Sequence, residues 1–190
     1  MSLITTVQPV REPVSLQELR DWARVDLTDD DALLDALIKN ARQAAENFLW
    51  RRLITQTVEY RLDRFPSVIR VPIAPVQAVA SISYNDGAGA AQTLAGSGYT
   101  VDSKSEPCRI VPAYQQTWPD TLGHLNDVTV TLTAGYGADA ETVPEPIRTA
   151  ILILAATWYE HREAVMFGAT PSVVPLSAEH LLRPHRLQGV

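Results

Sequence analysis

The spacing of hydrophobic positions changes twice along this 190-residue chain. Over residues 14–55 apolar side chains recur every three or four positions, which is typical of an α-helix with one buried face. Over residues 56–142 the period becomes two, as in half-buried strands, and helical spacing returns over residues 143–183. The pattern predicts an α+β protein, in which a discontinuous helical core is interrupted by an inserted antiparallel β module.

Two long helices dominate the predicted core. One covers residues 28–53: Thr28 is expected to cap it, Asp29–Asp31 suit the positive end of its dipole, and Arg51 and Arg52 suit the negative end. The other covers Pro144–Val165 and is apolar on most of its surface, so we expect a central strut with any excess facing a neighbouring subunit.

Shorter elements complete the prediction. Ser15 and Glu18 form a capping-box pattern that opens a short helix ending near Arg24, and residues 177–182 form another before Pro184. Residues 1–13 are expected to be an extended arm. Strands are predicted around residues 58–62, 69–73, 79–84, 92–94, 99–102, 109–111 and 128–132. Trp118 lies in the long loop before the last strand and either protrudes as a contact or folds back onto the sheet.

Composition excludes several classes of function. The chain carries a net charge of −6 with a pI near 5.2, which argues against gripping nucleic acid, because phosphate binding needs clustered cations. Cys108 is the single cysteine, so we expect a small buried side chain and neither a disulfide nor a cysteine-based zinc site. No apolar run is long enough to span a bilayer, and no secretory signal is recognisable, so synthesis in a cytoplasm is expected.

Candidate chemistry is sparse. Asp29–Asp31 could hold a hard cation, but adjacent helical residues point in different directions, and a helix start explains all three. His161 stands between Glu160 and Glu163 and could serve a small hydrolase as a general base, although a solvated helix end is the simpler interpretation. No phosphate-binding or nucleophile motif is present, so no catalytic residue, cofactor or metal ligand is assigned.

The C-terminal segment differs from the rest because it is locally basic and carries apolar anchors. It is either a disordered tail or a docking segment held by a partner chain. Its residues are Leu181, Leu182, Arg183, Pro184, His185, Arg186 and Leu187.

A family resemblance runs through nearly the whole sequence. It is carried by VSLQELRDWARVDLTDDDALLDALIKNARQAAENFLWRRLITQTVEYRLDRFP, by IRVPIAPVQAVASISY, by YTVD, CRIVPAY and VTVTLTAGYG, by VPEPIRTAILILAATWYEHREAV and by LLRPHRL. These segments resemble the head-tail connector, or neck adaptor, proteins of long-tailed bacteriophages and gene transfer agents. Unlike this chain, some relatives are nearly all helical, so the partner of the β module, including a decoration or host-contact role, stays open.

The resemblance implies a non-enzymatic virion protein that forms a ring of twelve subunits below the portal, joins the capsid to the next neck or tail protein, and lets DNA pass without specific binding. No membrane is involved. The implied ring-wall contacts are Leu34, Ile38, Arg42, Phe48, Trp158, Tyr159 and Arg162. The tail of residues 184–190, with the adjoining residues from Leu181, is the expected portal-docking segment. A neck stopper or tail-completion protein that contacts the tail tube is the alternative within the same structure.

Overall fold

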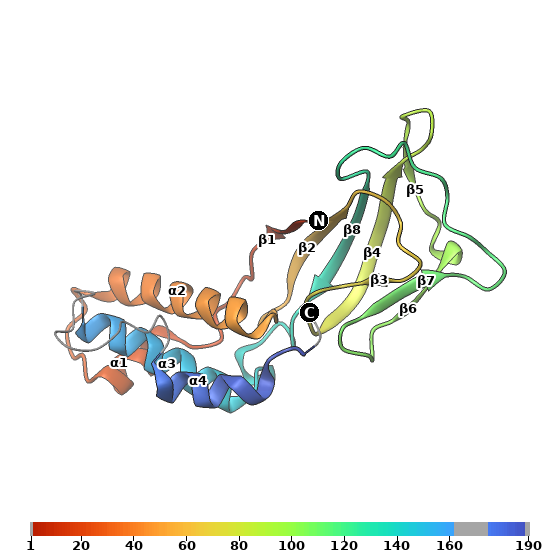
Figure 1. Cartoon of the computed structure of the whole chain (residues 1–190). Helices are drawn as coiled ribbons and strands as arrows, with labels where there is room; N and C mark the ends of the chain where they lie inside the picture. Colours follow the sequence, from red (N-terminus) through yellow and green to blue (C-terminus); the bar gives the residue numbers. More distant parts are fainter. Residues whose placement is uncertain (1, 162–174, 189–190) are drawn as a thin grey trace, which may run out of the picture. The chain divides into compact units, whose positions relative to one another are not determined.

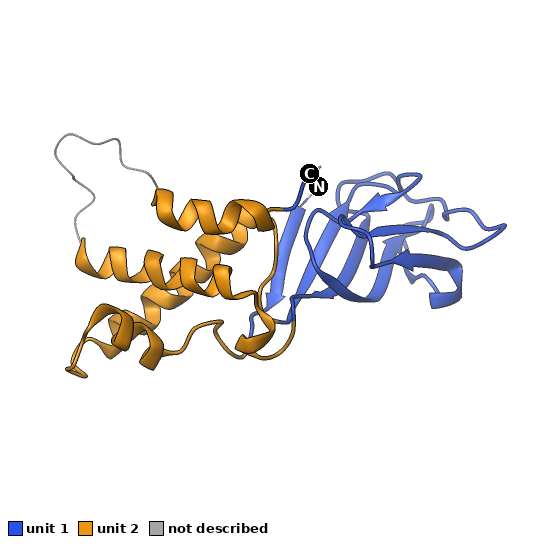
Figure 2. Cartoon of the chain, turned by 90° about the horizontal axis from the view of Figure 1, so that it is seen from below, with its two compact units in different colours: residues 1–9, 55–136, 187–190 blue, residues 10–54, 137–186 orange. Residues whose placement is uncertain are grey.

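The computed structural model describes residues 2–161 and 175–188, and the chain divides into two compact units (Figures 1 and 2). The β unit consists of residues 1–9, 55–136 and 187–190, and the helical unit of residues 10–54 and 137–186. The predicted α+β class is therefore confirmed.

The β unit contains two antiparallel sheets. The larger has the strand order β1-β2-β8-β4-β5 and the smaller the order β3-β7-β6. The strands of the larger sheet are β1 (Ser2–Val7), β2 (Gln56–Leu62), β4 (Val76–Asn85), β5 (Ala91–Thr93) and β8 (Val128–Ala134). Those of the smaller are β3 (Ile69–Arg70), β6 (Tyr99–Asp102) and β7 (Arg109–Pro112), with a short 3-10 turn, η1 (Gly96–Gly98), before β6.

One hydrophobic cluster holds the two sheets together. Alternate residues of β2 and β8 point inward, and in register they form the pairs Val58–Leu132 and Tyr60–Val130. Ile110 from the smaller sheet belongs to the same cluster, so the sheets pack face to face as a sandwich. Strict alternation made these strands predictable, because the other face of β2 and β8 is only half-buried.

The N-terminal residues are more ordered than the sequence suggests. The sequence predicts an extended arm over residues 1–13, and within it Ser2–Val7 pairs with β2 as an edge strand that a bulge interrupts between Thr5 and Val7. Strand β3 is shorter than predicted, since only Ile69 and Arg70 pair regularly.

The helical unit is built around α3 (Glu145–Glu160), which contacts α1 (Leu16–Ala23), α2 (Asp31–Leu49) and α4 (Leu176–Leu182). Figure 2 shows these helices as one compact group. Two 3-10 turns accompany them, η2 (Ala140–Thr142) and η3 (Arg183–His185). Among the described residues, no helix is both long and apolar enough to cross a membrane.

Helix α1 begins as predicted. The Ser15 hydroxyl accepts a hydrogen bond from the Glu18 backbone N–H, and the Glu18 carboxylate accepts one from the Ser15 backbone, so the capping box is complete. The helix ends at Arg24, in the left-handed region with φ 54°, which confirms the predicted end.

Helix α2 is shorter than predicted at both ends. It begins at Asp31 and not at Thr28, whose carbonyl accepts a turn hydrogen bond from the Asp31 N–H. Asp30 occupies the N-cap position without a side-chain cap; its carboxylate accepts a hydrogen bond from the Tyr159 hydroxyl at 2.6 Å instead. The helix ends at Trp50, which adopts φ 56°, so Arg51 and Arg52 lie beyond it.

Candidate functional site

The C-terminal segment is held by its own chain. The His185 carbonyl accepts a hydrogen bond from Arg51 Nε at 2.5 Å, and the Arg186 guanidinium lies 5.5 Å from the centre of the Phe48 ring. Leu182 and Leu187 are buried. Within residues 181–187 these contacts favour an ordered segment over a disordered tail, while the docking role stays a prediction.

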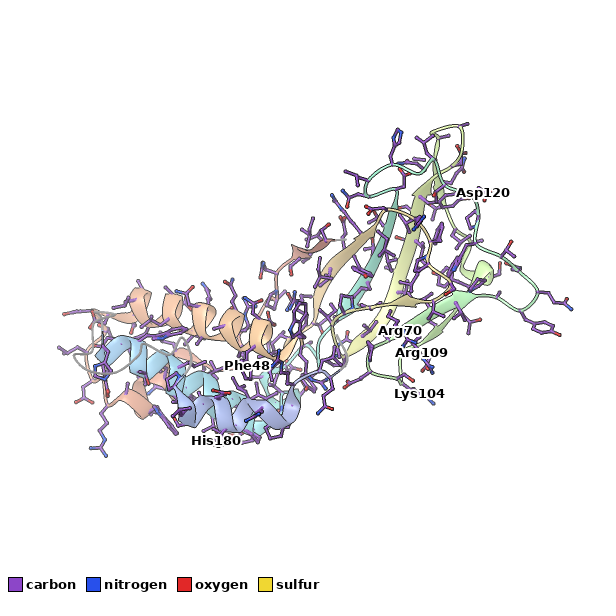
Figure 3. All side chains as sticks on the ribbon, in the orientation of Figure 1. Phe48, Arg70, Lys104, Arg109, Asp120 and His180 are labelled. Carbon is purple, nitrogen blue, oxygen red and sulfur yellow. The ribbon has the colours of Figure 1, made fainter. Side chains whose placement is uncertain are left out.

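The remaining residues of this segment form an accessible basic surface. Arg183, Pro184 and Arg186 are exposed, and Leu181 and His185 are half-buried. On the preceding helix His180 is also exposed, and Figure 3 shows it on the outside of α4. The predicted portal-docking residues thus separate into two anchors that stay inside the fold and five that a partner can contact.

Three of the predicted ring contacts are interior residues. Leu34 and Ile38 are fully buried, and Arg42 is 3 % exposed. Arg42 Nε bonds Glu12 at 2.7 Å and its Nη1 bonds Glu46 at 3.0 Å. These three side chains offer no surface to a neighbour, because the helical unit itself uses their packing and charge.

The other predicted ring contacts keep some surface. Phe48, Trp158 and Tyr159 are half-buried, and Arg162 lies outside the described residues. Three further apolar residues keep surface: Leu27 and Leu33, which are 70 % and 38 % exposed beside the start of α2, and Trp22, which is 50 % exposed on α1. The helical spacing of Leu19, Trp22 and Leu33 predicts burial for all three, so periodicity alone does not separate the exposed Trp22 and Leu33 from the buried Leu19.

The acidic and histidine clusters do not form catalytic sites in the described part of the chain. No group of three metal-binding side chains occurs there, and Asp31 pairs with Arg20. Glu160 and His161 are both exposed at the end of α3, and Glu163 lies outside the described residues. The geometry therefore gives no support to the metal site or to the hydrolase.

Two residues of the β unit, Cys108 and Trp118, have structural positions in the fold. Cys108 is buried, and this burial raises the pKa of its thiol to about 11, so it is an inert core residue. Trp118 folds back onto the sheet, with its ring stacked on Phe65 at 4.8 Å between centroids, whereas Tyr114 in the same loop is 89 % exposed.

Asp127 sits at the base of the same loop and makes the fold sensitive to acid. Burial acts to raise the pKa of this carboxyl, but hydrogen bonds from the Asn85 side chain and the His124 N–H outweigh it, and the pKa is lowered. A lowered folded-state pKa gives stability that is present above the unfolded-state pKa near 4 and lost as the pH falls through the folded value.

Asp127→Asn is therefore expected to flatten the fall in melting temperature between pH 5 and pH 2. Circular dichroism melts at a series of pH values would measure it. Asp120→Asn is the matched control, since Asp120 lies exposed on the same loop (Figure 3) and should leave the wild-type slope unchanged. If the melting temperature of the Asp127→Asn variant fell with pH as steeply as that of the wild type, Asp127 would not be a source of the acid sensitivity.

Comparisons with known proteins point to a structural protein. Residues 13–96 match the family described as phage gp6-like head-tail connector protein. A chain from the "Neck of empty GTA particle computed with C6 symmetry" is 26 % identical, with a TM-score of 0.82 over 100 % of this chain and 97 % of that chain. A chain from the "Virion of native gene transfer agent (GTA) particle" gives the same values.

A further chain, from the "Neck of native GTA particle computed with C12 symmetry", has the same fold at 24 % identity and a TM-score of 0.76, covering 100 % of this chain and 97 % of that chain. A comparison with curated proteins gave no match. Residues 13–96 are similar to the head-tail connector family, and a particle-neck chain is similar over the full length of this chain. Together these matches support the role of a structural connector.

Proposed function

We propose that this connector forms a closed ring below the portal of a tailed phage or phage-like particle, joins the capsid to the next neck or tail protein, and encloses the path of the DNA. The observation that carries the proposal is the likeness to a particle-neck chain over the full length of this chain, both units included. The related neck was computed with C6 symmetry, which rings of six or twelve subunits satisfy, and the family resemblance implies twelve.

A closed ring requires each subunit to present one surface to the left and a complementary surface to the right. In the helical unit, the exposed apolar residues Trp22, Leu27 and Leu33 are suited to one of these surfaces, because isolated apolar area gains stability when a neighbour covers it. Trp158 and Phe48 are half-buried and keep enough surface for the other. The two long helices α2 and α3 would then form the ring wall.

The portal-docking role is proposed for the accessible part of the C-terminal segment. Arg183 and Arg186 are exposed cations, while Leu182 and Leu187 fix the backbone beneath them. Contacts of His185 with Arg51 and of Arg186 with Phe48 already hold this segment, which lowers the ordering entropy that opposes binding. The overall charge of −6 suits a lumen that repels DNA and does not grip it.

Native mass spectrometry of the purified chain, alone and with its cognate portal, tests the ring. We expect a monomer or small oligomer alone and a closed ring in the mixture. A monomer that ignores the portal would overturn the connector assembly proposed here. A ring that binds the tail tube and not the portal would instead favour the stopper or tail-completion alternative.

Arg183→Glu tests the docking surface within the same experiment. We expect portal affinity to fall by about tenfold or more, because a charge reversal replaces attraction by repulsion at the contact. Arg64→Glu is the matched control, being an equally exposed arginine in the β unit. Unchanged affinity for the Arg183 variant, with an intact melting temperature, would exclude this segment as the portal contact.

A further inference from the structure

The outer face of the smaller sheet carries a shallow hollow of about 180 Å³. Its two valines give an apolar floor, and charged side chains stand at its rim. Figure 3 labels Arg70 and Arg109 on this part of the β unit, where β3 pairs with β7. The lining residues are Val68, Arg70, Thr100, Asp102, Arg109 and Val111.

Two arginines face each other directly across β3 and β7, since Arg70 and Arg109 are register partners. Like charges at directly opposed positions destabilise an antiparallel pair, so this arrangement needs a compensating anion. Arg109 has one: its Nη2 bonds Asp102 Oδ2 at 2.5 Å and Ser105 Oγ at 3.2 Å. The exposed Arg70 side chain has no ion pair or hydrogen bond with any described residue.

The carboxylate of Asp102 already accepts several hydrogen bonds within its own chain. Asp102 also accepts hydrogen bonds from the Ser105 hydroxyl at 2.7 Å and from the Lys104 N–H at 3.2 Å. The Ser105 hydroxyl, together with Arg109, holds the pKa of Asp102 well below its usual range, so this carboxylate stays charged. It neutralises Arg109 and leaves the charge of Arg70 uncompensated.

We propose that this hollow binds an aspartate or glutamate side chain from a partner protein chain. The incoming carboxylate pairs with Arg70 and relieves its repulsion with Arg109, while the aliphatic stem contacts Val68 and Val111. Duplex DNA fits less well, because phosphate recognition needs several clustered cations and this chain is acidic overall. The site belongs to the β unit and would stand even if the ring proposal failed.

The test uses the full chain and the peptide acetyl-Val-Glu-Val-amide as the probe, with the arginine side-chain N–H signals followed by NMR. We expect saturable shifts at Arg70 and Arg109 with the glutamate peptide, and no saturable shift with the matched glutamine peptide. Arg70→Gln should weaken binding by about tenfold, because the unpaired guanidinium supplies the charge-assisted bond.

Asp102→Asn is expected to have the opposite effect on the affinity for the glutamate peptide. It frees Arg109 from its internal partner while an amide oxygen can still accept the turn hydrogen bonds, so we expect binding to tighten by about threefold or more. Arg64→Gln, an equal charge change away from the hollow, should leave affinity as it is. Equal binding of the glutamine peptide, insensitivity to Arg70→Gln, or preferential binding of a short DNA duplex at these signals would each overturn the proposal.

Discussion

Replacing Glu46 by alanine is expected to destabilise the helical unit by about 3–5 kcal/mol, the usual cost of breaking a buried ion pair. Glu46 is 4 % exposed; one carboxylate oxygen bonds Arg42 at 3.0 Å, and the other accepts the Leu53 backbone N–H at 2.9 Å. Truncation removes both acceptors, so a buried cation loses one of its two carboxylates and a buried N–H loses its partner.

Urea unfolding followed by helical circular dichroism would measure this loss. Glu46→Gln should fall between wild type and Glu46→Ala, because its amide oxygen can keep the bond to Leu53 but brings no charge to Arg42. Asp35→Ala is the surface control: Asp35 pairs with Lys39 on the same helix with about half of each side chain exposed, and should cost about 0.5 kcal/mol or less. A loss below about 1 kcal/mol for Glu46→Ala would show that the buried network is not a major contributor.

Helix α2 shows why sequence patterns located the helices but did not identify the buried ion pairs of Arg42. The three- and four-residue period identified α2 because it depends only on which positions are apolar. Arg42 looked like a surface residue, since a charge on a helix normally faces water. It is buried because Glu12, 30 positions earlier in the chain, supplies a carboxylate, and local periodicity carries no information about such a partner.

The end of α2 was missed for a related reason. Helices commonly end on glycine, whereas α1 and α2 end on Arg24 and Trp50, both with positive φ. A tryptophan gives no stop signal, so the predicted end of α2 moved to the next cations, Arg51 and Arg52. The N-terminal strand was missed because its short run has no partner within reach in the sequence; β2 lies about fifty positions away.

The interaction surfaces were predictable only in part. Basic residues near the C-terminus drew attention to the segment proposed for docking, but its attachment through Arg186 and Phe48 joins positions far apart in sequence. The hollow on the smaller sheet depends on the register that opposes Arg70 and Arg109, which the pattern of either strand alone does not determine. In both cases the sequence shows which residues are present but not which of them lie next to each other in the fold.

Ile38→Ala is expected to lower the free energy of unfolding by about 2–5 kcal/mol, because a fully buried isoleucine loses its contacts and leaves a cavity. The result distinguishes two roles for this residue. As a ring contact, Ile38 would affect assembly and leave the stability of the isolated chain nearly unchanged. As a core residue, 1 % exposed between packed helices, it should affect stability first.

Leu33→Ala supplies the matched comparison, because Leu33 lies on the same helix but is 38 % exposed. We expect it to cost about 1 kcal/mol or less in stability, since a partly exposed side chain loses little buried area, and to weaken ring formation with the portal. Chemical denaturation and native mass spectrometry on both variants would separate the effects. If Ile38→Ala left stability intact but prevented ring formation, the interior placement of Ile38 would be wrong. The ring contact would then lie on the face of α2 that carries Ile38.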